Sequence, residues 1–271
     1  MKKLSFLLII ISFALLFVSC SKTQIPQTIN DFNQYYVIKV TDGDTIKVSE
    51  NGETNSMRFI GVDTPELHSG DKPEGELGHE AYYFTGNAII KKSKYFVYVQ
   101  FDGDKYDNYD RLLGYIYYKD ENGNLKLLNA ELLEKGLGRP LFYDDTSAKK
   151  DIFTEAYKKA YNDRAGIFAY YDDPARIKKD SELEDSDIGK IRWVEFYAEN
   201  VRKDGKFYKI YSDTGKFYIS IRQEEYNAFF ETLNPFDLKD RKIRIYGEVW
   251  KDSQYVYEIL ARAEFEFKII E

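Results

Sequence analysis

The sequence contains very little cysteine, histidine or tryptophan. Its 271 residues include one cysteine, two histidines and two tryptophans. A single cysteine, Cys20, cannot form an intramolecular disulfide, so the fold must be held together by its hydrophobic core. The same scarcity excludes a zinc site built from cysteines or from several histidines.

The sequence also lacks an excess of positive charge, because its formal net charge is -7. This argues against a protein that coats nucleic acid, since such proteins gain affinity from many contacts of lysine and arginine with phosphates. An enzyme that concentrates a few arginines and a cation at one site remains compatible with it. Hydrophobic residues make up 43% and charged residues 31%, which indicates a folded chain, long enough for two modest domains.

A hydrophobic run near the N-terminus extends from Leu4 to Val18, after Lys2 and Lys3. It is too short to span a membrane comfortably, and it ends at Ser19-Cys20. This pattern resembles a bacterial lipoprotein signal. We therefore expect residues 1–19 to be a signal peptide, Cys20 to carry lipid and residues 20–34 to be a tether. The resemblance implies a membrane-anchored protein outside the cytoplasm; the alternative is an ordinary secretory peptide with a chance cysteine.

The next part of the chain, residues 35–171, predicts a mainly β domain. Short alternating segments bounded by Asp-Gly and Asn-Gly turns are typical of strands, and two longer amphipathic segments are typical of helices. The strands are expected at about residues 36–40, 45–48, 58–62, 95–101 and 112–118, and the helices at 80–90, 129–135 and 147–168. Five strands and three helices in this order suit an OB-fold-like five-stranded barrel.

The rest of the chain divides into an acidic stretch and a second strand-rich region. Residues 172–187 contain a proline and lack an apolar period, which predicts a linker. Residues 188–271 predict five strands with a short helix between the third and the fourth. This is the order of a second OB-fold-like β domain, and a generic five-stranded β domain is the alternative.

The stretch most suited to chemistry is Met57 to Glu66. It begins with Arg58 and ends with Asp63 and Glu66 on a turn made rigid by Thr64-Pro65, which is a good place for a metal and a base. More acids lie upstream in Asp42-Gly43-Asp44-Thr45 and another arginine downstream in Tyr109-Asp110-Arg111. Alone, each piece has an ordinary structural interpretation: a hairpin turn, an Arg58–Glu66 bridge, a strand tyrosine.

Together, these motifs resemble the thermonuclease (staphylococcal-nuclease-like) family over about residues 35–168. The matching segments are V-x-D-G-D-T at Val40–Thr45, R-x-x-x-V-D-T-P-E at Arg58–Glu66, G-x-E-A at Gly78–Ala81, Y-x-R at Tyr109–Arg111 and N-x-x-L-x-x-x-G-L at Asn129–Leu137. Each motif alone is weak, but all of them occur in the family's order.

The resemblance implies a Ca²⁺-dependent nuclease that hydrolyses phosphodiester bonds of DNA or RNA and leaves a 3′-phosphate. Asp44, Asp63 and Thr64 match the family's calcium ligands, and Glu66 matches its candidate general base. Four further positions match phosphate-clamping arginines and substrate-contacting tyrosines: Arg58, Arg111, Tyr109 and Tyr143. No obligate protein partner is indicated by the sequence.

The sequence departs from the family in ways that remove positive charge around the site. The loop after Glu66 holds Asp71, Glu74 and Glu76 against Lys72, and Asn108 stands where a lysine is common. These changes predict weaker substrate capture or a different substrate. The alternative function is a catalytically weak nuclease-like module that binds nucleic acid or protein, but such a module would be expected to have lost Glu66 or an arginine.

The second β domain carries large aromatic residues on strand faces opposite its predicted core. The core faces contain Val194, Phe196 and Ala198, then Ile243, Ile245 and Val249. The opposite faces carry Trp193, Tyr197, Tyr218, Arg222, Arg244, Tyr246 and Trp250. Aromatics interleaved with arginines could stack on unpaired bases, or they could pack against the nuclease barrel. Both interpretations remain open at this point.

Overall fold

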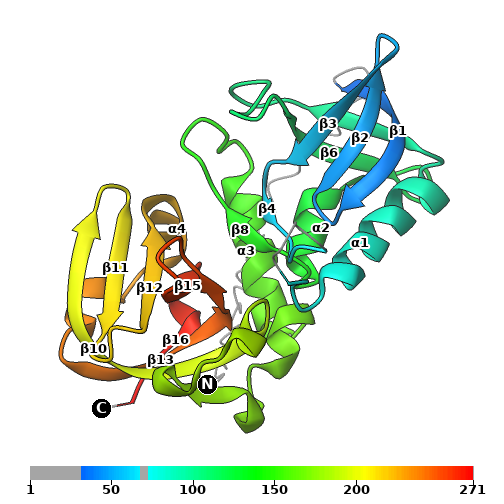
Figure 1. Ribbon diagram of the computed structural model, residues 1–271. Coiled ribbons are helices and arrows are strands. Elements are labelled where there is room, and N and C mark those ends of the chain that lie inside the picture. Colours follow the sequence, from blue (N-terminus) through cyan, green and yellow to red (C-terminus); the bar gives the residue numbers. More distant parts are fainter. Residues whose placement is uncertain (1–31, 68–72, 271) are drawn as a thin grey trace, which may run out of the picture.

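The structure is a computed structural model that describes residues 32–67 and 73–270. The predicted signal peptide and Cys20 lie outside these residues. Figure 1 shows two β domains at opposite ends of the molecule, with the green helix α3 (Lys150–Asn162) between them. None of the helices in the described part of the chain is long and apolar enough to cross a membrane.

The first domain is the predicted five-stranded barrel. Its sheet has the order β3-β2-β1-β5-β6-β7, and a parallel pairing of β3 with β6 closes it. The five barrel strands are β1 (Asn33–Asp42), β2 (Thr45–Glu50), β3 (Glu53–Phe59), β5 (Phe96–Gln100) and β6 (Leu112–Lys119), and the short β7 (Leu125–Leu127) extends the sheet beyond β6. Alternating side chains such as Val37, Ile46 and Val97 fill the interior, as the period of two predicts.

Three helices cover this barrel, as the sequence predicts, although their ends differ. They are α1 (Gly78–Gly86), which continues as the π-helical turn η2 (Asn87–Lys92), α2 (Leu128–Glu134) and α3. The predicted helix over residues 147–168 is too long, because α3 ends at Asn162. Arg164 and Gly166 adopt φ values of 53° and 52°, which a right-handed helix does not allow, and the 3₁₀ turn η3 (Gly166–Tyr170) follows.

The predicted strand through Arg58 and Val62 is broken in the structure. β3 ends at Phe59, and the separate strand β4 (Gly61–Asp63) pairs with β8 (Arg139–Leu141) in a two-stranded sheet. Gly61 has φ +77°, and a Cβ atom there would lie 2.3 Å from the Phe153 ring, so a larger residue does not fit. The break leads the chain off the barrel and towards α3 and the second domain.

The second domain is a curled eight-stranded sheet with the order β14-β15-β12-β11-β10-β13-β16, to which β9 is added beside β10. Its elements are β9 (Ile177–Lys179), β10 (Ile191–Asp204), β11 (Phe207–Ser212), β12 (Phe217–Arg222), α4 (Gln223–Phe229), β13 (Arg241–Glu248), β14 (Trp250–Lys251), β15 (Tyr257–Ala261) and β16 (Phe267–Ile269). In the first domain β1 pairs antiparallel with β2 and β5, and β3 pairs parallel with β6. In the second domain β10 pairs antiparallel with β11 and β13, and β12 pairs parallel with β15. The two domains therefore share the same OB-like strand order.

Two segments of this half differ from simple strands or loops. Residues 172–187, predicted as a linker, contain β9 and the 3₁₀ turns η4 (Pro174–Arg176), η5 (Asp180–Glu182) and η6 (Asp185–Asp187). The strand predicted over 255–270 is interrupted after β15 by the 3₁₀ turn η8 (Glu264–Glu266), and η7 (Pro235–Leu238) precedes β13. The interruption after β15 places Arg262 at the interface between the domains.

Large aromatics join the two domains. Trp193 and Tyr246 are each 2% exposed and pack with Tyr171 of the first half, at ring-centroid distances of 4.8 and 5.1 Å. The Trp193 indole donates to the Tyr171 carbonyl at 2.7 Å, and the Tyr246 hydroxyl donates to the Ile167 carbonyl. These two residues therefore form a domain interface, and the stacking-platform interpretation is wrong for them; Tyr197, 42% exposed, remains on the surface.

Candidate functional site

The predicted metal ligands come together where the chain leaves the barrel and enters the two-stranded sheet. Asp44 lies in the turn between β1 and β2 and is fully buried, and Asp63 ends β4. The turn packs tightly against the chain after β4: a Cβ atom on Gly43 would lie 2.7 Å from the Thr64 hydroxyl oxygen. Only glycine allows this approach, which explains the Asp-Gly-Asp sequence of the turn.

The Asp44 carboxylate is held by several donors. Its Oδ2 accepts hydrogen bonds from the Thr64 backbone N–H at 2.7 Å and from the Thr64 hydroxyl at 3.0 Å. Its Oδ1 accepts from the Thr45 hydroxyl at 3.0 Å and pairs with the Arg58 guanidinium. Burial raises the pKa of Asp44, against the lowering effect of Arg58 and these hydrogen bonds. The carboxylate is thus desolvated and fixed in orientation.

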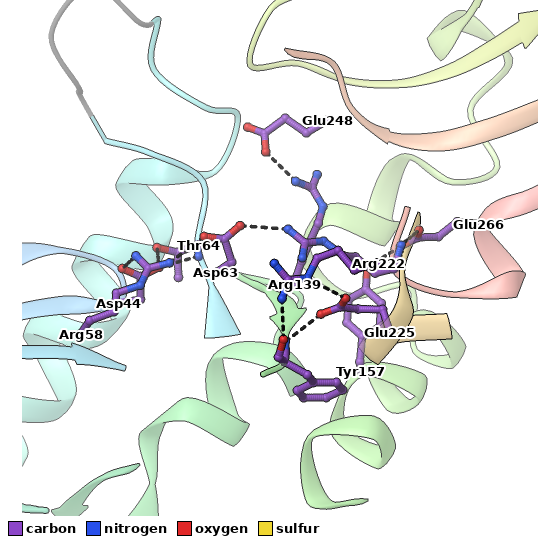
Figure 2. A network of polar contacts seen from close by, with 12 residues as sticks. Asp44, Arg58, Asp63, Thr64, Arg139, Tyr157, Arg222, Glu225, Glu248 and Glu266 are labelled. Atoms are coloured by element: carbon purple, nitrogen blue, oxygen red, sulfur yellow. Dashed lines mark hydrogen bonds and ion pairs between the residues drawn. The ribbon is translucent and has the colours of Figure 1, made fainter. Parts of the chain in front are cut away.

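Arg58 joins the two carboxylates. Its Nη1 pairs with Asp44 Oδ1 and its Nη2 with Asp63 Oδ1 at 2.6 Å (Figure 2). Arg58 thus pairs with Asp44 and Asp63, and not with Glu66 as the alternative of a structural bridge would require. Burial alone would raise the pKa of Asp63, but the Arg58 and Arg262 guanidinium groups hold it below its usual range. Arg58 therefore pairs with both acids at the strand end, and Arg262 pairs with Asp63 as well.

The donor set at this position suits a hard cation. The two carboxylates and Thr64 offer oxygen ligands, which are the ligands that Ca²⁺ takes in proteins. Within residues 32–67 and 73–270, no three histidine, cysteine or carboxylate side chains gather into a cluster that could hold a metal ion. The fit therefore rests on two acids, Asp44 and Asp63, with Thr64 beside them.

Glu66 lies three residues beyond Asp63 and is partly exposed. Its backbone carbonyl accepts a hydrogen bond from Gly75 N–H at 2.8 Å, which ties it to the far end of the following loop. The pKa of Asp42 is raised to about 7, mainly by burial and then by the negative charges of Asp44 and Glu66. Glu66 thus belongs to the same group of acids and keeps access to solvent.

A cavity of about 260 Å³ is lined by Arg58 but by none of the acids Asp44, Asp63 and Glu66. Among the side chains that line it are four predicted site residues, Arg58, Tyr109, Arg111 and Tyr143. Arg111 pairs through Nε and Nη2 with Asp107, both at 2.7 Å, and Tyr109 is 80% exposed. The structure therefore brings both predicted phosphate-clamping arginines and both predicted substrate tyrosines to one cavity.

Several charged residues near this site were not predicted from the sequence; Figure 2 shows two of them, Arg139 and Glu248. Arg262 Nη2 donates to Asp63 Oδ2 at 3.0 Å across 199 positions of the chain. Arg139, which pairs with Asp63 in the β4–β8 ladder, makes an ion pair with Glu248 at 2.5 Å. No local pattern signals these contacts, because the partners come from different domains and from the unforeseen interruption after β15.

Comparison with known proteins places the similarity in the first domain. A sequence profile described as "Staphylococcal nuclease homologue" matches residues 56–170. An uncharacterized protein of Methanocaldococcus jannaschii is 34% identical over 160 residues, which cover 52% of this chain and 74% of that protein. A thermonuclease of Staphylococcus hyicus is 33% identical over 135 residues, covering 50% of this chain and 75% of the relative. Endonuclease YncB of Bacillus subtilis is 31% identical over 144 residues, covering 51% and 64%.

Proposed function

The chain belongs to the staphylococcal nuclease homologue family, and from this premise we propose that it is a Ca²⁺-dependent nuclease that hydrolyses phosphodiester bonds of DNA or RNA. One observation carries the proposal. Arg58 bridges Asp44 and Asp63 at the edge of a cavity that also holds Arg111 and Tyr109. A phosphate in this cavity would meet two guanidinium groups, with the acids of the cation site behind one of them.

The proposed cation-binding residues are Asp44, Asp63 and Thr64. When bound there, Ca²⁺ supplies positive charge that polarises the phosphate. Arg58 pairs with both carboxylates and also lines the cavity, so its guanidinium would be placed to meet a phosphate bound there. The forked donors of Arg58 and Arg111 can each meet two phosphate oxygens, which both orients the phosphodiester and stabilises the charge that develops on it.

Glu66 is the proposed general base. Its partial exposure and its place among the acids allow it to take a proton from a water that attacks the phosphorus. Tyr109 and Tyr143 are proposed to contact the substrate, since both line the cavity with exposed rings. These roles are carried over from the family onto matching positions of this chain.

The test is digestion of single-stranded DNA, double-stranded DNA and RNA by the purified chain with Ca²⁺, and with a chelator. We expect cleavage with Ca²⁺, loss of cleavage with chelator and recovery when Ca²⁺ is restored. Asp44→Asn is the matched variant, because it keeps the shape of the buried side chain and removes its charge. Equal activity with and without chelator, or full activity of Asp44→Asn, would contradict the proposed cation site.

The alternative is a nuclease-like module that binds nucleic acid or protein without turnover. The acidic surroundings of the site would then limit the protein to weak binding. The same assay separates the two functions: a binding module would shift the mobility of a labelled strand in the presence of Ca²⁺ without producing shorter fragments, and Glu66→Gln would leave that shift unchanged.

We also propose that Cys20 carries lipid and anchors the protein to a membrane outside the cytoplasm. The support is the resemblance of residues 1–20 to a lipoprotein signal. Cys20→Ala is expected to move the protein from the membrane fraction to the soluble extracytoplasmic fraction without lowering its specific activity. A Cys20→Ala protein that stays in the membrane fraction would point to an uncleaved hydrophobic anchor instead.

A further inference from the structure

The second domain reaches the proposed metal site through Arg262. This arginine follows β15, and its Nη2 donates to Asp63 Oδ2 at 3.0 Å, while Arg58 holds Asp63 Oδ1 at 2.6 Å. The two oxygens of one proposed ligand are therefore held by arginines from two different domains. Figure 2 shows the Asp63 carboxylate near Arg58 and Thr64, on the side of the site that faces Arg139.

Arg262 is fixed in place from both domains. Its backbone N–H donates to Glu266 Oε2 at 2.7 Å, and Glu266 in turn accepts a hydrogen bond at 2.6 Å from the Tyr157 hydroxyl on α3. Its side chain is only 4% exposed. Within the described residues its Nε and Nη1 have no hydrogen-bond partner and Asp63 is its ion-pair partner. A buried guanidinium with one carboxylate partner is a strong and directional contact.

Other contacts between the domains surround this one. Glu248 of β13 pairs with Arg139 at 2.5 Å, beside Asp63 in the β4–β8 ladder. Glu76, in the loop after Glu66, accepts hydrogen bonds from Arg176 at 2.8 Å and from Ile191 N–H at 2.9 Å. Arg262 is therefore one of several contacts by which the second domain is joined to the chain around Asp63.

The second domain also holds the wall of the substrate cavity. Arg222 Nη2 donates to the Phe142 carbonyl at 2.7 Å, and Glu225 Oε1 accepts from Phe142 N–H at 2.7 Å. The Arg222 guanidinium lies 4.6 Å from the centroid of the Tyr143 ring. Tyr143 lines the cavity, so both the acids and the cavity wall of the first domain are supported by the second.

We propose that Arg262 is a positioning residue for the nuclease reaction, supplied to the metal site by the second domain. It holds Asp63 Oδ2 and so fixes the rotation of a carboxylate that would help to hold the cation. This inference rests on the proposed nuclease function. It also predicts an electrostatic effect, because a guanidinium beside a ligand repels a divalent cation.

The test compares Arg262→Met with wild type in the full-length protein. Ca²⁺ affinity is measured by calorimetry without substrate, and kcat and KM are measured at saturating Ca²⁺. Arg262→Met removes a positive charge that repels Ca²⁺, and it also leaves the Asp63 side chain free to rotate. The lost repulsion is the larger of these two effects, so we expect several-fold tighter Ca²⁺ binding in Arg262→Met. We expect kcat to fall roughly 10- to 100-fold, since Asp63 is no longer held in one orientation.

Arg192→Met is the control, because Arg192 is another arginine of the second domain, and its ion pair at 2.9 Å is with the buried carboxylate of Asp187 and not with Asp63. If Arg262 had only a structural role, Arg262→Met and Arg192→Met would both lower the melting temperature. The two variants would then have the same Ca²⁺ affinity and the same kcat. That result would overturn the proposal.

If Arg262→Met does not fold, Arg262→Lys decides the question, since it keeps the charge in the buried site. We expect near-normal Ca²⁺ affinity and a several-fold lower kcat at unchanged KM, because an ammonium does not reproduce the geometry of the guanidinium. A wild-type kcat in Arg262→Lys would overturn the proposal. Absence of Ca²⁺-dependent cleavage by the wild type would instead contradict the nuclease function, while the change in Ca²⁺ affinity still reports on Arg262.

Discussion

Arg58 shows how one residue links the structure and the chemistry of this site. Its guanidinium neutralises Asp44 and Asp63 and lines the substrate cavity at the same time. A buried pair of carboxylates without such a partner would be costly, because each charge has lost its water. Arg58 therefore stabilises the pair of carboxylates, and under the proposed function it would also meet the phosphate.

Glu66→Gln is expected to lower kcat by about 10² to 10⁴ if Glu66 takes the proton from water. The amide keeps the size of the side chain but cannot accept that proton, so KM should change little. Steady-state kinetics on a short oligonucleotide at saturating Ca²⁺ measure both values. Glu80→Gln, on an exposed position of α1, is the control and should keep wild-type kcat. Near-normal turnover of Glu66→Gln would show that another group is the base.

Asp187 provides a prediction about pH and stability. Burial opposes the effect, but Lys178 at 2.7 Å, the Glu184 N–H and Arg192 hold the pKa of Asp187 below its ordinary value of 3.8. A carboxyl whose pKa is lower in the folded state stabilises the fold above the unfolded-state pKa, and this stability is lost as pH falls through the folded-state pKa. Asp187→Asn should therefore lower the free energy of unfolding by about 1–3 kcal/mol at pH 7.

Urea denaturation of wild type and Asp187→Asn between pH 7 and pH 3 measures this dependence. The difference between the two proteins should be constant down to about pH 5 and should shrink as the pH falls below the ordinary pKa of 3.8. A difference that stays the same at pH 3 would mean that the side chain acts through its shape and not through its charge.

The break between β3 and β4 is the element that makes the site. β3 belongs to the barrel, β4 belongs to the small sheet with β8, and Gly61 allows the turn between them. The sequence predicts the strands and the spacing of Arg58, Asp63 and Glu66, since alternation and motif order are local. It does not predict the break, because apolar residues continue through Phe59, Ile60 and Val62, and alternation alone cannot show a change of partner strand.

Asn129 on α2 stabilises the break between β3 and β4. Its fully buried amide donates to the Ile60 carbonyl at 2.8 Å and to the Gly114 carbonyl at 3.3 Å, and its Oδ1 accepts from Ile116 N–H at 2.7 Å. Asn129→Ala would leave these backbone groups without that partner, and each buried unsatisfied group costs about 1–3 kcal/mol. We expect the free energy of unfolding to fall by the cost of one or two such groups. We also expect lower activity, because Asp63 follows the break.

Urea denaturation measures the loss, and Asn122→Ala, on an exposed turn, is the control and should be close to wild type. If Asn129→Ala keeps wild-type stability but loses activity, the asparagine acts only on the site. If it keeps both, water replaces its hydrogen bonds and the break does not depend on it.

At the level of the whole molecule, the two domains share one aromatic core. Trp193 and Tyr246 of the second domain belong to the same buried cluster as Phe168 and Tyr171 of the first. A period of two shows that Trp193 faces away from Val194, but it cannot show whether solvent, nucleic acid or another domain covers that face. For the same reason the sequence gives no sign of Arg262 beside Asp63, although each residue is plainly charged.

This shared core predicts that the domains unfold together. Trp193→Ala removes a side chain that is 2% exposed and a hydrogen bond to Tyr171, so it should cost about 3–5 kcal/mol. Because the indole contacts both halves, calorimetry should show a single transition at a lower temperature, with the nuclease activity lost in the same range. Tyr197→Ala, on the same strand but 42% exposed, should leave the melting temperature nearly unchanged. Two separate transitions in Trp193→Ala, with activity following only the first domain, would show that the domains are stable independently and that the second domain is not needed to hold the site.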